Sequence, residues 1–339
     1  MSDYAYIKLQ RENEWLRKEL HLMQNSTAYR LGRYLTFLPH KAKTLAYNYQ
    51  LKKQNTLRKE SLLKAKSHVP INEAGHILLT FLEDGSWANA YDAFLANPKI
   101  YKDGKLHFRD IVLPIPLNKS DCYIFLLSIF ESCFVYLLEE YGGGGYFLHF
   151  PNEMPYECGT VALKKNDIVI DAGSCMGEFA ALAGVRGCIA FAFEPIPYVI
   201  ENYLKKTAEW NKSIEICEYA LSDKNGELTF SIDASMIGSS SQLKHENETE
   251  SIRVKAITLD DFVQKRNLPR VDFIKADIEG AERNMLKGAK NVLKEFAPKL
   301  AICTYHLPDD PQVIRSIILD ANPRYVIEDR QDKLFAYVP

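Results

Sequence analysis

The chain has 339 residues, of which 47% are hydrophobic and 25% are charged, and its formal net charge is −2. This composition excludes a disordered or fibrous protein and is typical of a globular chain with one sizeable domain and additions. The seven cysteines lie far apart and form no Cys-x-x-Cys pair, which favours a reducing compartment and argues against a zinc site.

The first segment, residues 1–66, is basic, because it holds 14 lysines and arginines but 5 acidic residues. No basic stub is followed by an apolar core, so we expect no secretory signal and a cytoplasmic location. Between Tyr6 and Met23 apolar residues recur at heptad spacing with Asn13 at a core position, which is typical of a short two-stranded coiled coil. An amphipathic helix packed on its own domain fits equally well. We predict a helical N-terminal extension, with homodimerisation through it as one of two alternatives.

The second half of this extension, residues 25–66, interleaves aromatic and aliphatic side chains with basic ones. This pattern fits peripheral contact with the inner face of a membrane, and it also fits a solvated linker helix. The aromatic residues recur at helical spacing and do not alternate as they would on a sheet that stacks bases. We therefore expect no nucleic-acid partner.

Residues 67–150 form a mixed region of helices and a strand, which we expect to pack on the domain that follows. The run Leu106–Leu113 predicts a strand. The apolar run Cys122–Leu138 is interrupted by Glu131 and is too short to span a membrane, so it predicts a buried helix. Four consecutive glycines, Gly142–Gly145, exclude regular structure and indicate a linker or a lid.

Residues 151–339 alternate short β-branched runs with helical stretches. Such alternation predicts an α/β domain with a mostly parallel sheet and helices on its faces. The last two runs, Tyr325–Glu328 and Leu334–Val338, are joined by a short polar link and predict a C-terminal antiparallel hairpin. The segment Ala234–Glu250, rich in serine, glycine and acidic residues, predicts a long exposed loop.

The main motif of this region is a buried strand that ends in a glycine turn, Ala172–Gly177, before a helix. Gly173 allows a sharp turn and lets a ligand approach the backbone, and Gly177 permits close approach at the start of the helix. A dinucleotide fold normally shows Gly-x-Gly-x-x-Gly, but here Cys175 takes the place of the middle glycine. A NAD-dependent oxidoreductase is therefore the weaker interpretation of this motif.

The next two strands add polar residues at the same edge of the sheet. Glu194 ends the second strand, where a carboxylate can accept both hydroxyls of a ribose. The third strand ends near Ser222 and Asp223, which would face an adenine ring, although Asp223 is also a favourable turn residue. We predict that the residues that bind a nucleoside cofactor are Asp171, Gly173, Ser174, Gly177, Glu194, Pro195, Ser222, Asp223 and Asp277.

Several segments resemble the FkbM family of methyltransferases in order and spacing: DIVIDAGSCMGEF, AFEPIP, YALSDKNGELTF, ITLDDF and VDFIKADIEGAERNMLKGA. The resemblance covers about residues 156–310, and its most specific part is the Asp-x-Glu-Gly-Ala-Glu block that begins at Asp277. The chain departs from the family at Ser174 and Cys175, where Ala-Asn is usual. The resemblance implies a Rossmann-like methyltransferase fold with a mostly parallel seven-stranded sheet, and S-adenosylmethionine as the cofactor.

The family acts on hydroxyls of sugars, polyketide-type metabolites and other acceptors. The resemblance therefore implies O-methylation, and we expect the acceptor to be a sugar or glycan intermediate of surface polysaccharide biosynthesis. A small-metabolite hydroxyl is the alternative acceptor. A non-catalytic interaction protein is disfavoured, because Glu194 and Asp277 are both present.

In methyl transfer the protein must hold the acceptor hydroxyl behind the sulfonium methyl and manage one departing proton. Asp277, at the end of its strand, is the first candidate to orient or deprotonate that hydroxyl, and capping of the next helix is its structural alternative. Glu279 lies in the following turn, where an acidic residue also suits a helix N-terminus. His306 ends the next strand and is a candidate general base or a structural residue. These three side chains suit a divalent metal chemically, but no spacing signature requires one and we predict none.

Overall fold

The structure is a computed structural model in which Leu62–Pro339 forms one compact unit. It describes residues 73–75, 77, 80, 89–117, 119–137, 155–232, 250–330 and 332–339. The predictions made for the coiled-coil segment, for the basic segment after it, for the four glycines and for the loop at 234–249 lie outside the described residues.

A sheet of seven strands forms the centre of the described unit, in the order β12-β13-β11-β10-β4-β5-β6. The neighbours from β11 to β6 are parallel, and β13 is antiparallel to both β11 and β12. This arrangement confirms the predicted α/β fold, the mostly parallel seven-stranded sheet and the C-terminal hairpin. The strands are β4 (Ile168–Ala172), β5 (Ile189–Phe193), β6 (Ile214–Cys217), β10 (Phe273–Ala276), β11 (Lys299–Cys303), β12 (Val326–Arg330) and β13 (Lys333–Tyr337).

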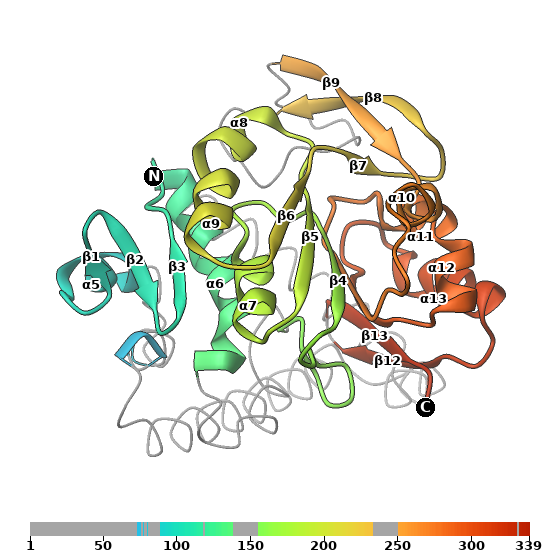
Figure 1. Cartoon of the computed structure of the whole chain (residues 1–339), viewed down its shortest axis with the longest axis horizontal. Coiled ribbons are helices and arrows are strands. Elements are labelled where there is room, and N and C mark those ends of the chain that lie inside the picture. The colour runs from blue at the N-terminus through green and yellow to red at the C-terminus, as the bar shows by residue number, and fades with distance from the viewer. Residues whose placement is uncertain are drawn as a thin grey trace, which may run out of the picture. The chain divides into compact units, whose positions relative to one another are not determined.

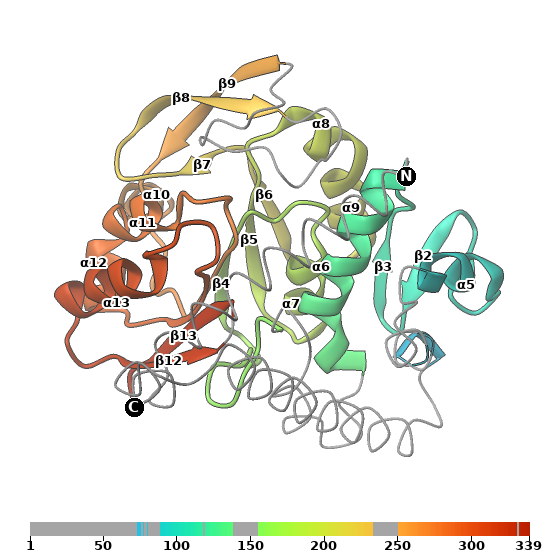
Figure 2. The same cartoon turned by 180° about the vertical axis from the view of Figure 1, so that it is seen from behind.

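Helices cover both faces of this sheet (Figures 1 and 2). Successive side chains of a strand point to opposite faces, so Val169 packs in one apolar cluster while Ile168 and Ile170 pack in the other. The first cluster lies under α6 (Lys119–Leu137), α7 (Glu178–Val185) and α9 (Lys205–Trp210). The second lies under α10 (Leu259–Arg266), α11 (Glu282–Lys287), α12 (Lys290–Glu295) and α13 (Asp310–Ala321).

The region before the sheet contains α5 (Ala90–Ala96), β1 (Tyr101–Lys102), β2 (Lys105–Phe108) and β3 (Ile111–Leu113). The single strand predicted over Leu106–Leu113 is wrong, because β2 and β3 form an antiparallel hairpin in which Phe108 pairs with Ile111. Arg109 turns the chain there with a φ of 57°. The buried helix predicted in the next apolar run is confirmed by α6. Among the described residues no helix is long and apolar enough to cross a membrane.

A second, smaller sheet lies apart from the main one at the upper edge of Figure 1. It contains β7 (Ala220–Leu221), β8 (Gly226–Ile232) and β9 (Glu250–Ile257), with β8 and β9 antiparallel. The third strand predicted from the sequence runs on to Ser222 and Asp223, which would join β6 to β7 as one strand. Instead β6 ends at Cys217, and a tight turn in which the amide of Tyr219 donates to the carbonyl of Cys217 leads into β7.

Candidate active site

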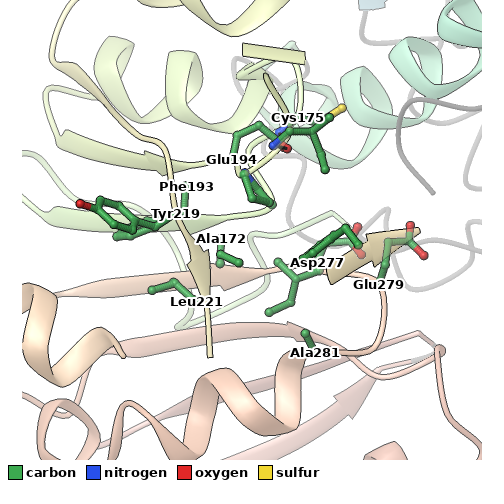
Figure 3. A pocket seen from close by; sticks show the side chains of 15 residues that line it. Ala172, Cys175, Phe193, Glu194, Tyr219, Leu221, Asp277, Glu279 and Ala281 are labelled. Atoms are coloured by element: carbon green, nitrogen blue, oxygen red, sulfur yellow. Dashed lines mark hydrogen bonds between the residues drawn. The ribbon is translucent and has the colours of Figure 1, made fainter. Parts of the chain in front are cut away.

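A pocket lies at the carboxyl edge of β4, β5 and β10, and β8 contributes to its wall. Its empty volume is about 600 Å³, a figure that includes space continuous with the solvent. Figure 3 shows Glu194 beside Cys175 in one part of the pocket and Asp277 beside Glu279 in another. Five of the predicted site residues line the pocket: Gly173, Glu194, Pro195, Asp277 and Glu279.

The glycine turn between β4 and α7 requires its two glycines. Gly173 has a φ of +74°, and a Cβ there would lie 1.9 Å from the carbonyl oxygen of Asp277, so any side chain would collide with backbone. Gly177 has a φ of +88°, and a Cβ there would lie 2.8 Å from a methyl carbon of Leu204 in the π-helix η5 (Ile200–Leu204). The turn therefore lies directly against the segment that follows β10.

A buried ion pair between Asp171 and Lys275 supports this turn. One oxygen of Asp171 lies 3.1 Å from the Nζ of Lys275, and the other accepts a hydrogen bond of 2.7 Å from the hydroxyl of Ser174. Lys275 also donates to the carbonyl of Gly173 at 2.5 Å. Burial by itself would lower the pKa of Lys275, but the carboxylates of Asp171 and Asp277 raise it, so the ammonium group stays charged. Asp171 and Ser174 thus support the turn and do not line the pocket.

Glu194 joins the end of β5 to the glycine turn. Its side chain is buried, and its two oxygens accept hydrogen bonds from the amide of Ile196 at 2.9 Å and from the amide of Cys175 at 3.1 Å. Burial raises the pKa of Glu194 to about 7, although these two bonds and Lys275 act to lower it. The pocket therefore contains a buried carboxyl group whose charge changes near neutral pH.

Asp277 follows β10 and is held by two tyrosines. The hydroxyl of Tyr156 donates to one carboxylate oxygen at 2.7 Å, and the hydroxyl of Tyr305 donates to the other at 3.0 Å. Burial would raise the pKa of Asp277, but His306, Lys275 and Lys333 lower it to about 2, so the group is a carboxylate. It does not cap the next helix, since the N-cap of α11 is Ala281 and that cap has no side-chain hydrogen bond.

His306 lies among three carboxylates just after β11. Its Nε2 is 3.7 Å from Asp277 and 3.4 Å from Glu279, and its Nδ1 is 3.2 Å from Glu282. Burial would lower the pKa of the imidazole, but Glu282 and Glu279 raise it well above its usual value. With these neighbours alone, the imidazole is protonated near neutral pH and has no lone pair with which to act as a general base.

The family model described as the Methyltransferase FkbM domain matches residues 131–325. The chain belongs to the FkbM methyltransferase family. This match confirms the expected methyltransferase domain and S-adenosylmethionine as its cofactor.

The chain also has partial similarity to individual proteins that have a name or a solved structure. The hexuronic acid methyltransferase AglP of Haloferax volcanii is 27% identical over 159 residues, which are 47% of this chain and 64% of AglP. The chain thus matches less than two thirds of the length of that relative. The structure of the methyltransferase FkbM from Methylobacillus flagellatus KT aligns at 20% identity over 76% of this chain and 60% of that chain, with a TM-score of 0.42. Fibrillarin of Aeropyrum pernix with bound S-adenosyl-L-methionine aligns at 16% identity over 55% and 69% of the two chains, with a TM-score of 0.32.

The pocket of this FkbM domain fits the nucleoside part of the cofactor. Each carboxylate oxygen of Glu194 can accept two hydrogen bonds and already accepts one, so the group retains capacity for two ribose hydroxyls. Ile196, Leu221 and Phe230 provide an apolar wall of the kind that an adenine ring requires. Gly173 lines the same pocket, and its lack of a side chain lets the turn lie against the backbone of Asp277.

The predicted adenine residues lie elsewhere in the FkbM domain. Ser222 is buried and its amide donates to the carbonyl of Ile257, while Asp223 is exposed, and neither lines the pocket. The reason is the turn after Cys217, which moves the chain out of the main sheet. Tyr219, before the two predicted residues, lines the pocket instead.

Two buried lysines were missed by the sequence analysis. Lys333 of β13 forms ion pairs of 2.6 Å with Glu131 of α6 and 2.7 Å with Asp332, and its Nζ lies 4.7 Å from the ring centre of Tyr156. Lys275 supports the glycine turn from β10. For Lys275 the only sequence signal was a lysine inside an otherwise apolar strand. Lys333 begins β13 at the end of a polar link, and its partner Glu131 lies 202 residues away along the chain.

Proposed function

We propose that this chain transfers the methyl group of S-adenosylmethionine to a hydroxyl of a sugar or glycan intermediate of polysaccharide biosynthesis. The observation that carries the proposal is one pocket lined by both Glu194, which suits a ribose, and the anionic Asp277. Its partial match to a hexuronic acid methyltransferase supports a sugar acceptor.

The bound cofactor supplies an electrophilic methyl group on sulfur. Glu194 and the glycine turn bind its nucleoside part, and Asp277 orients the acceptor hydroxyl by accepting its hydrogen bond. With a pKa of about 2, Asp277 is a weak base, so it does not ionise the hydroxyl beforehand. A hydroxyl oxygen becomes strongly acidic once it bonds to the methyl carbon, and a weak base then suffices to receive its proton. Tyr156 and Tyr305 keep the carboxylate in place.

Asp277→Asn is expected to lower kcat by about 100-fold or more, because the amide is a poor proton acceptor. The dissociation constant of S-adenosylmethionine should change little, since the residue acts on the acceptor. Single-turnover methyl transfer and calorimetric titration of the cofactor measure the two quantities. Asp309→Asn, which alters an exposed carboxylate after β11, is the matched control. An unchanged kcat in Asp277→Asn would contradict the assignment.

The overall proposal is tested by incubating the full chain with labelled S-adenosylmethionine and two sets of acceptors. One set contains hexuronic acids, nucleotide sugars and lipid-linked glycans, and the other contains small hydroxylated metabolites. We expect label transfer to the first set. Transfer to metabolites only would overturn the glycan acceptor, and failure to bind the cofactor would overturn the proposal as a whole.

We also propose that residues 1–66 form a helical extension through which two copies associate at the inner membrane surface. The heptad pattern from Tyr6 to Met23 and the basic charge of residues 1–66 support this proposal. Deleting residues 1–24 is expected to halve the particle mass measured by light scattering. An unchanged mass would exclude this segment as the dimer contact, and sedimentation with anionic vesicles tests the membrane contact.

A further inference from the structure

Side chains that can bind a metal ion converge beside the pocket. Ligand atoms of Asp277, Glu282 and His306 all lie within 4.8 Å of one another. Around one six-coordinate ion, neighbouring ligand atoms are roughly 3 Å apart and opposite ones roughly 4.2 Å apart. Small adjustments therefore let the three groups contact the same ion. They come from the end of β10, the start of α11 and the end of β11.

The hydrogen bonds in this cluster are incomplete. The side chain of His306 is 6% exposed and that of Glu282 is 0% exposed. Both imidazole nitrogens lie near carboxylates, but neither makes a hydrogen bond of normal geometry, and one oxygen of Glu282 has no hydrogen-bond partner. The other oxygen of Glu282 accepts from the amide of Ile278 at 2.8 Å. Buried polar groups are normally satisfied, so these atoms mark a site for a further ligand.

The charges favour a divalent cation. The carboxyl groups of Asp277, Glu279 and Glu282 surround one imidazole. Nearby Lys275 pairs with Asp171, and Lys333 pairs with Glu131 and Asp332, so both lysines already have carboxylate partners.

We propose that Asp277, Glu282 and His306 bind a divalent cation of the Mn²⁺ type, with Glu279 at the rim. Two carboxylates and one imidazole suit Mn²⁺ better than Mg²⁺, which prefers oxygen ligands alone. Asp277 and Glu279 also line the pocket, so the ion lies where an acceptor hydroxyl can bind to it. This role rests on the proposed methyl transfer, and there the ion would orient the hydroxyl and make it more acidic.

Electron paramagnetic resonance tests the site on the full chain after treatment with a chelator. Titration with Mn²⁺ is expected to show one bound ion per chain, and the bound ion should show a ¹⁴N coupling from an imidazole. This coupling is measured on the wild-type protein, so the test does not require a variant to fold. The absence of stoichiometric binding, or a bound ion without nitrogen coupling, would overturn the proposal.

The variants His306→Gln and Glu282→Gln are each expected to raise the Mn²⁺ dissociation constant at least tenfold. Asp309→Asn, with an exposed carboxylate, should leave it unchanged. Wild-type affinity retained in both site variants would place the ion elsewhere and overturn the assignment. Cofactor binding and label transfer are measured separately. If the cofactor binds and the label is transferred but Mn²⁺ does not bind, the metal proposal fails and the methyl transfer stands. If Mn²⁺ binds but no label is transferred, the metal site stands and the methyl transfer fails.

Discussion

Glu194→Gln is expected to weaken the binding of S-adenosylmethionine by about 100-fold at pH 8. Hydrogen bonds to a charged group contribute about 1.5–3 kcal/mol each, and the variant loses the charge that two ribose hydroxyls would share. A total loss of about 3 kcal/mol corresponds to roughly 100-fold in the dissociation constant. Calorimetric titration measures this change. The matched control is Glu201→Gln, an exposed carboxylate in the helical segment after β5.

The pH dependence gives a second test of Glu194. Because burial raises its pKa to about 7, the carboxyl is protonated in the free protein at lower pH. The cofactor affinity of the wild type should therefore rise with pH up to about 7 and then level off, while that of Glu194→Gln stays flat. A flat wild-type profile would contradict the ribose assignment. The charged groups that face Glu194 are Lys275, which lowers its pKa, and Asp171, which raises it, and the Cys175 thiol lies beside them.

The same pKa predicts a stability change of defined sign. Between the ordinary value of 4.5 and about 7, the folded state holds a proton on Glu194 that the unfolded state releases. The free energy of unfolding of the wild type, relative to Glu194→Gln, should therefore fall as pH rises through this window. The fall is on the order of 3 kcal/mol, at about 1.4 kcal/mol per pKa unit. Urea unfolding of the cofactor-free proteins at several pH values measures it.

Lys275→Met is expected to lower the free energy of unfolding by about 3–5 kcal/mol, because removing one partner of a buried ion pair leaves an uncompensated charge. That charge is Asp171, which is fully buried. The glycine turn also loses the donor to its Gly173 carbonyl, so the folded fraction should bind the cofactor more weakly. Chemical unfolding and cofactor titration measure the two effects.

Two further variants check this explanation. Adding Asp171→Asn to Lys275→Met should restore part of the lost stability, because the buried charge is then removed. Lys205→Met, which breaks an exposed ion pair with Glu201, should leave the unfolding midpoint unchanged. A double variant that is even less stable than Lys275→Met would show that packing, and not charge, explains the loss.

The sequence predicted well those features that depend on neighbouring residues. Short apolar runs such as Ile168–Ala172 form parallel strands because only a sheet covered on both faces buries such runs completely. The positive φ at Gly173 and the carboxylate at the end of β5 also follow from local chemistry. Both features could be predicted because turn geometry and ligand chemistry restrict which residue types can occupy these two positions.

Pairing between distant segments was not predictable in the same way. The runs that form β8 and β9 have the same strand-forming composition as those of the main sheet, and composition does not say which sheet a strand joins. The sequence around Asp277 also fitted a second role for this residue, capping of the next helix. The carboxylate of Asp277 instead accepts a hydrogen bond from Tyr156, which lies 121 residues away along the chain.

The sequence by itself thus determined the α/β class, the glycine turn, the carboxylate at the end of β5 and the family. The tertiary structure alone decided which groups surround these elements. It placed Lys275 under the turn, Lys333 beside Tyr156, and His306 between Glu279 and Glu282. The physical reason is that burial and charge pairing depend on contacts between β10, β11, β13, α6 and α11, and no spacing along the chain records those contacts.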